Sequence, residues 1–196
     1  MSSWRLLHVG LIVAGLTLGC GGGGGGGSPT TPPPPPPPPP PPSEGIFFTA
    51  EAMPGDNTIF LEGIDTTNTD ARFVVEVRAN ELEDVYGVSF DLQYPTDLIT
   101  WRRGNFSEGS FLNEGGSVET QILVDRRPSG NIVVGITRVG EEEGVSGSGV
   151  LLTLEFINEV VAGTGELTFS DNDVVNAAGD IDGDSQWLAG SVESKI

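Results

Sequence analysis

The sequence predicts an all-β protein, an antiparallel β-sandwich that follows an N-terminal segment with no core of its own. Between about residues 46 and 196, apolar and polar side chains alternate with period two in many short runs. Clusters of Gly, Pro, Asn and Asp separate these runs, and no window of useful length repeats its apolar residues at helical spacing. Roughly 150 residues suffice for one such domain with a sizeable core.

The first 19 residues have the composition of a secretion signal. A weakly basic start with Arg5 and His8 precedes an apolar run that ends on Gly19 and is too short to anchor stably across a bilayer. Residues 16–20, LTLGC, resemble the bacterial lipobox, whose cysteine is acylated and becomes the mature N-terminus. We therefore expect an exported protein that is lipid-anchored to the membrane through Cys20, the only cysteine. The residue after Cys20 is Gly21 and not Asp, which favours sorting of the lipoprotein to the outer membrane or cell surface. An unmodified thiol is the alternative.

Residues 20–45 are predicted to be a disordered tether, because they offer almost no apolar side chain to bury. Gly21 to Gly27 form flexible coil. The eleven prolines Pro32 to Pro42 form a polyproline II rod, at about 3.1 Å per residue roughly 34 Å in all. The chain thus divides into a lipoprotein signal peptide (1–19), a Gly/Pro-rich tether (20–45) and a sandwich domain (46–196).

Nine runs within the domain are predicted to be strands. Their apolar residues fall on alternate positions, so each strand has one buried and one exposed face. The six clearest are residues 73–79, 86–94, 117–124, 131–137, 150–157 and 165–169. Three shorter ones are residues 58–61, 98–102 and 190–194.

The charge and the residue inventory exclude several classes of function. The chain has 9 Lys and Arg against 28 Asp and Glu, a net charge of −19, so its surface repels nucleic acid and anionic headgroups. The single histidine, His8, lies in the signal, and Cys20 is the lipidation site, so acyl-transfer triads and most zinc sites lack their residues. The many Asp and Glu residues do not exclude a carboxylate pair that hydrolyses glycosides, but we expect that the protein is not an enzyme.

The order and spacing of the runs resemble the cohesin domain over nearly all of residues 46–196. The resemblance rests on VEVRAN (75–80), VYGVSFDLQYPTDL (85–98), GNFSEGSFL (104–112), GNIVVGI (130–136), GSGVLLTLEF (147–156) and GELTF (165–169). It implies a jelly-roll sandwich of about nine strands. It also implies a non-catalytic module that docks a dockerin-like module of a secreted polysaccharide-degrading or surface protein.

The resemblance places the recognition face on one sheet, with strands matching residues 85–94, 117–124, 131–137 and 150–157. Alternation then selects the side chains that leave the core. We expect the partner to contact Ser89, Asp91, Gln93, Val133, Thr137, Leu151, Thr153 and Glu155. Many cohesins have an Asp where this chain has Ser89, and Asp91 is a possible substitute on the same side. An ordinary solvated surface is the alternative.

Two other features leave room for further ligands. Trp101 and Trp187 suggest stacking on a sugar, so a carbohydrate-binding module with the same fold is the alternative function, and a structural or adhesive surface protein is a third. Oxygen ligands of the kind that Ca²⁺ prefers gather in two acidic stretches. The candidate ligands are Asp171, Asp173, Asp180, Asp182 and Asp184, with plain turn chemistry as the alternative.

If these aspartates hold structural calcium, adding Ca²⁺ to the domain releases or absorbs heat and raises the melting temperature. Isothermal titration calorimetry and a thermal melt check both. No heat and no rise in melting temperature would remove the calcium site.

Overall fold

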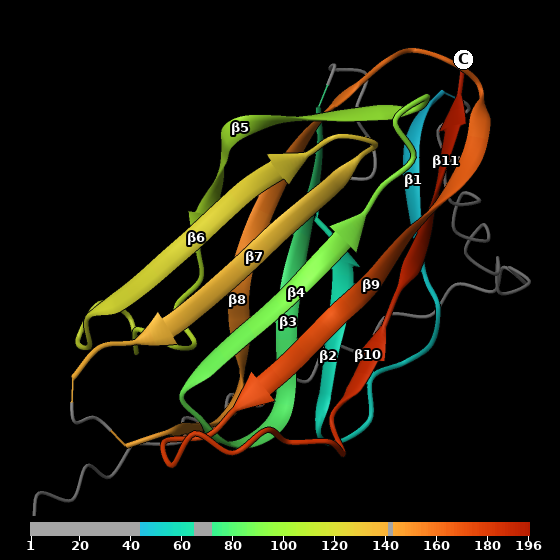
Figure 1. The fold of residues 1–196 in the computed structure, drawn as a ribbon. Helices are drawn as coiled ribbons and strands as arrows, with labels where there is room; N and C mark the ends of the chain where they lie inside the picture. The colour runs from blue at the N-terminus through green and yellow to red at the C-terminus, as the bar shows by residue number, and fades with distance from the viewer. Residues whose placement is uncertain (1–43, 65–71, 141–142) are drawn as a thin grey trace, which may run out of the picture. The chain divides into compact units, whose positions relative to one another are not determined.

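The computed structural model describes residues 44–64, 72–140 and 143–196, which form two stacked β-sheets (Figure 1). The predicted signal, lipidation site and nearly all of the tether lie outside the described residues. The strands are β1 (Gly45–Ala50), β2 (Thr58–Gly63), β3 (Arg72–Val85), β4 (Gly87–Gln93), β5 (Ile99–Glu108), β6 (Thr120–Arg127), β7 (Asn131–Arg138), β8 (Val145–Asn158), β9 (Gly163–Val175), β10 (Gln186–Leu188) and β11 (Gly190–Lys195).

One sheet has the strand order β1-β11-β9-β4-β7-β6 and the other has the order β10-β2-β3-β8-β5. Adjacent strands are antiparallel except for β10, which runs parallel to β2. The all-β sandwich is therefore confirmed, and each of the nine predicted runs lies largely within a strand. The described residues contain two more strands than predicted. β1 directly follows the tether, and β10 has only three residues, too few to show alternation.

The core lies between the sheets and is rich in aromatic side chains. Phe73 of β3 and Phe156 of β8 pack with ring centroids 6.0 Å apart, and Tyr94, just after β4, packs on Phe156 at 5.3 Å. The described part of residues 44–196 contains eleven strands and a continuous core, so we expect this segment to fold on its own. None of the described residues form a helix long and apolar enough to cross a membrane.

A bulge in β8 overturns one expectation of the alternation. Val77 of β3 pairs with Leu152, whereas the next residue, Arg78, pairs with Val150, so Leu151 has no partner in the ladder. Leu151 and Leu152 are both buried, at 1% and 0% exposure. The prediction that Leu151 points out of the core is therefore wrong.

The bulge also brings β8 against the chain that follows β5. The Gly109 N–H donates to the Leu151 carbonyl at 3.0 Å, and a Cβ atom added at Gly109 would lie 2.0 Å from the Val150 carbonyl oxygen. By contrast, a Cβ added at Gly135 of β7 would meet nothing within 4 Å.

We expect Gly109→Ala to lower the free energy of unfolding by about 2 kcal/mol or more, because backbone must move to admit the methyl group. Gly135→Ala, the matched control, is expected to raise it by about 0.5 kcal/mol, since glycine costs conformational entropy within a strand. Urea unfolding of both variants measures the difference. Equal stability of the two would contradict the tight packing at Gly109.

Candidate functional site

The outer face of β9, β4, β7 and β6 brings together residues from four strands. The register sets Ser89 opposite Gly135, which in turn lies opposite Leu123 of β6. On the other side of β4, Ser89 lies opposite Asp173 of β9. Residues paired across neighbouring strands share a face, so these four positions form one row across the sheet.

A shallow apolar depression of about 560 Å³ lies on this face. Gly87 and Gly135 help to form its floor, because neither carries a side chain that would fill it. Leu123, 60% exposed, lies at its edge, and the remaining outward-facing lining is Tyr86, Ser89, Gln121, Thr137 and Val175. An apolar floor with hydroxyl and amide groups at the margin suits a protruding apolar side chain of a partner.

Asp91 has a different setting from the exposed carboxylate that the sequence suggested. Its side chain is only 8% exposed, and Oδ2 accepts hydrogen bonds from Asn131 Nδ2 at 2.7 Å and from Arg127 Nη1 at 3.4 Å. Since a buried carboxylate requires such partners, Asp91 helps to fix β4 against β7. The expectation of a solvent-facing Asp91 is corrected accordingly.

Five of the eight predicted contact residues do share this face. They are Ser89, Asp91, Gln93, Val133 and Thr137, on the neighbouring strands β4 and β7. The other three do not join them, because β8 belongs to the other sheet. Leu151 is in the core, while Thr153 and Glu155 pair with Glu76 and Val74 of β3 and are half-buried there. The strand that joins β4, β7 and β6 in this face is β9, which pairs with β4.

Sequence reasoning missed Leu123, Tyr86, Gln121 and Val175 as lining residues. Leu123 carried a readable signal, since Ile122 and Val124 flank it and alternation puts a residue between two inward positions on the outer face. No local sequence pattern identifies Val175 as a lining residue. Its place beside Gly87 follows from the pairing of β4 with β9, which joins residues far apart in the chain.

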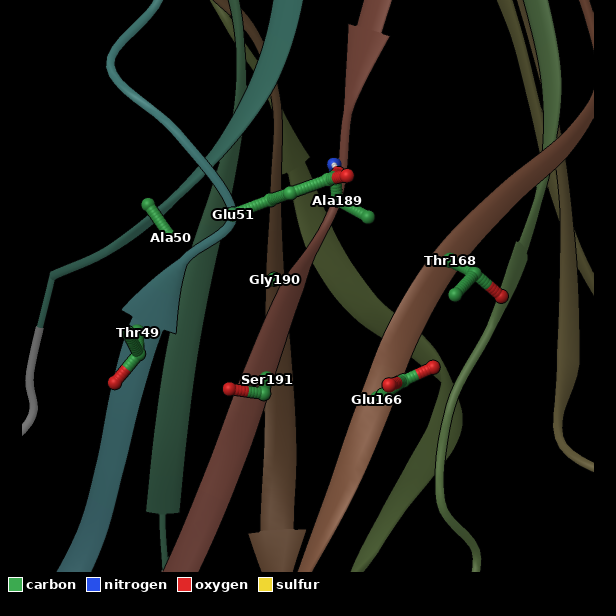
Figure 2. Close-up of a pocket in the computed structure, with 8 residues that line it drawn as sticks. All are labelled: Thr49, Ala50, Glu51, Glu166, Thr168, Ala189, Gly190 and Ser191. Atoms are coloured by element: carbon green, nitrogen blue, oxygen red, sulfur yellow. Dashed lines mark hydrogen bonds between the residues drawn. The ribbon is translucent and has the colours of Figure 1, made fainter.

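A second, more polar depression of about 270 Å³ lies on the same sheet, toward β1 (Figure 2). Thr49, Ser191 and Glu166 lie side by side on β1, β11 and β9, and the small residues Ala50 and Ala189 also line the trough. Glu51 closes one end, where its Oε2 accepts a hydrogen bond from the Ala189 N–H at 2.9 Å. This trough offers hydroxyl and carboxylate groups but no aromatic surface.

Neither tryptophan forms an open platform for a sugar ring. Trp101 has 0% exposure, and its Nε1 donates to the Asn105 carbonyl at 2.9 Å. Trp187 is half-buried, with ring centroids 5.6 Å from Phe90 and 5.1 Å from Phe169. Both indoles therefore pack within the protein, which corrects the suggestion that they stack on a ligand.

The five candidate calcium ligands are dispersed. Asp171 and Asp173 lie within β9, and Asp182 is engaged by Asn57, by the Ser185 hydroxyl and by the Asp184 N–H. Among the residues with described positions, no three acidic, histidine or cysteine side chains converge to hold a metal ion. Calcium binding stays a prediction, carried by the loop from Asp180 to Asp184.

The comparisons with known proteins bear on the fold. No family model matches the chain, and no curated protein matches it. Among solved structures, the second type II cohesin module from the adaptor ScaA scaffoldin of Acetivibrio cellulolyticus is similar over 74% of this chain and 88% of its own, with a TM-score of 0.55 and 11% identity. Type II cohesin A11 from Bacteroides cellulosolvens matches over 66% and 93%, with a TM-score of 0.53 and 12% identity.

A third similar structure contains a bound partner. It is the sixth cohesin from scaffoldin B of Acetivibrio cellulolyticus, solved in complex with a Cel5 dockerin. It matches over 74% of this chain and 96% of its own, with a TM-score of 0.53 and 13% identity. At such identities the likeness speaks for the fold, and residues 44–196 form a cohesin-like β-sandwich.

Proposed function

We propose that this chain is a non-catalytic docking module, tethered to the cell surface, which binds a dockerin-like module of a secreted polysaccharide-degrading or surface protein. The observation that carries the proposal is the apolar depression around Gly135 and Leu123, on the outer face of β9, β4, β7 and β6. We name these residues, with Tyr86, Ser89 and Val175, the docking face.

The chemistry of the docking face favours a protein partner. Its exposed apolar element is Leu123, and its floor is backbone and glycine, so a partner side chain can approach closely. In protein interfaces a few buried anchor residues provide most of the binding energy, and the contacts around them mainly exclude water. Polar groups around the depression, such as Ser89, Gln121 and Thr137, supply directional hydrogen bonds at its margin.

The partner is proposed from the similar structures. Those with a bound protein hold dockerins, such as the scaffoldin B cohesin, and another is a complex between CaDoc0917 and CaCohA2 at a TM-score of 0.52. One fold hosts many functions, so this analogy identifies a partner class to test.

The tether completes the proposal. Acylation of Cys20 would fix the chain to a membrane, and residues 20–45 would hold the docking face at a distance from it. A carbohydrate-binding module with the same fold is the other outcome that the test must separate. The burial of Trp101 and the packing of the half-buried Trp187 on Phe169 weigh against it.

Residues 44–196 used as bait are expected to capture a dockerin-bearing protein from the secreted proteins of the source cell, with calcium present. Leu123→Ala is expected to weaken the captured complex about five- to thirtyfold, since an apolar anchor contributes about 1–2 kcal/mol. Gly135→Tyr is expected to abolish binding, because the new ring fills the depression. The substitution fits the fold, since a Cβ atom at this position meets no other atom within 4 Å. Calorimetry with the purified partner measures both.

Thr153→Tyr is the matched control, since it adds the same ring to the outer face of the other sheet. Binding that survives Gly135→Tyr but fails with Thr153→Tyr would move the docking site to β3 and β8. Retention on insoluble cellulose or chitin, with no protein captured, would replace the proposal by a carbohydrate-binding module.

Cys20→Ala is expected to shift the full-length protein from the membrane fraction to the soluble exported fraction, because the acylated residue is lost. Fractionation of the source cell and the mass of the N-terminal peptide measure this. Gly27→Ala, which keeps the cysteine, serves as the control. Unchanged membrane association of the Cys20 variant would contradict the lipid anchor.

A further inference from the structure

Positive charge is concentrated at one corner of this acidic protein. Of its nine Lys and Arg residues, Arg5 lies outside the described part, which leaves eight. Four of these eight, Arg102, Arg103, Arg126 and Arg127, lie where β5 and β6 run along the same open side of the sandwich. We call these four residues the arginine corner.

A bulge in β5 pushes part of the corner outward. Trp101 pairs with Phe156 and Phe106 pairs with Leu154, so residues 102–105 lie opposite a single residue of β8. The Trp101 Nε1 bond to the Asn105 carbonyl closes this bulge, and Gly104 adopts the positive φ of 90° that it requires. Arg102 and Arg103 are thereby displayed together at its tip.

The two strands of the corner are joined to each other. Arg103 pairs with Asp125 of β6, and Arg126 Nη1 donates to the Trp101 carbonyl at 3.3 Å. Arg127 Nη1 lies 3.4 Å from Oδ2 of Asp91 in β4. These contacts fix the side chains of Arg103, Arg126 and Arg127 at the corner.

Most of the donors in the corner are still open to solvent. Arg102 makes no hydrogen bond or ion pair with any residue of the described chain, and the Arg103 and Arg127 side chains are 72% and 61% exposed. A guanidinium carries five N–H donors in a planar fork that matches a carboxylate, and Arg103 uses one of its five. The corner therefore has the capacity to bind several carboxylates.

The opposite end of the sandwich supplies the complementary charge. β6 ends at the corner, whereas β3 and β9 end at the far end of the sandwich (Figure 1). A cleft of about 540 Å³ lies at that far end, lined by Glu83 and Asp84 at the end of β3 and by Asn176, just after β9. Its carboxylates are Asp56, Glu81, Glu83, Asp84, Asp182 and Asp184, and its lining among the described residues includes no Lys or Arg. The Ser185 hydroxyl, followed by the Asp184 N–H, lowers the pKa of Asp182, so this carboxylate stays ionised near neutral pH.

We propose that the arginine corner binds the acidic cleft of a second copy of this chain, in a head-to-tail contact. Because corner and cleft lie at opposite ends of one sandwich, a copy cannot fill its own cleft. The contact is heterologous, so each bound copy still offers one free corner and one free cleft, and short chains of copies form.

We expect the head-to-tail contact between two copies to be weak. At an ionic strength of about 0.15 M, the long-range repulsion between two acidic copies is screened beyond about 8 Å, while adjacent guanidinium and carboxylate groups still attract. Exposed ion pairs contribute little each, so the contact needs several of them and a high local concentration. Attachment of many copies to one membrane surface provides such a concentration.

The test uses residues 44–196 in sedimentation velocity at about 0.15 M salt, up to about 1 mM, a concentration typical of tethered partners. One variant, Arg102→Gln with Arg103→Gln, disables the corner. A second, Asp56→Asn with Glu83→Gln and Asp184→Asn, disables the cleft through side chains that bond to no other described residue. Arg72→Gln with Lys195→Gln is the control, because it removes two positive charges elsewhere.

The native protein and the control are expected to associate as concentration rises, and each disabled variant to stay monomeric. A mixture of the two disabled variants is expected to give dimers of one copy each and nothing larger, since each retains one working end. Monomeric native protein at the highest concentration would overturn the proposal, as would a mixture that stays monomeric. Stronger association of the arginine variant would also overturn it, because the arginines would then only protect the edges of β5 and β6 from pairing.

Discussion

The packing of the two sheets against each other is the constraint on which the rest of this structure depends. Phe156 of one sheet packs on Tyr94, just after β4 of the other sheet, at a ring distance of 5.3 Å, and Phe73 packs beside Phe156 at 6.0 Å. Trp101, which pairs with Phe156, is fully buried. Once alternate side chains of β4 and β7 enter this core, the residues between them must lie on the outer face of the sheet. The docking face is thus a consequence of the core, and its residues are held by strands rather than by loops.

Glycine gives this face its shape. At Gly135 the chain forgoes a side chain on an open surface, although nothing near its Cβ position prevents one. A glycine within a strand costs stability, so packing does not explain this one. The close approach of a partner proposed above would account for it. At Gly109, in contrast, the neighbouring Val150 carbonyl leaves no room for any side chain, and packing alone accounts for the residue.

Much of the fold and part of the site could be predicted from the sequence, because alternation is a local signal. It correctly assigned the inward residues of β4 and β7, including Phe90, Leu92, Ile132 and Val134. It failed at Leu151, since a bulge adds a residue without changing the apolar pattern. Alternation also cannot tell which of two sheets a strand joins, and the cohesin resemblance wrongly assigned residues 150–157 to the same sheet as residues 85–94. The buried setting of Asp91 depends on Asn131, forty residues away, and no local pattern shows that contact.

Side-chain footprinting with hydroxyl radicals tests the central claim most directly, since it reports which side chains a bound partner shields. In the complex of residues 44–196 with the captured partner, the account predicts reduced oxidation of Leu123 and Tyr86. It predicts unchanged oxidation of Val160 and Ile181, each 62% exposed on loops outside the docking face. Unchanged oxidation of Leu123 and Tyr86 with the partner fully bound would contradict the account, because the partner would then occupy another surface of the sandwich.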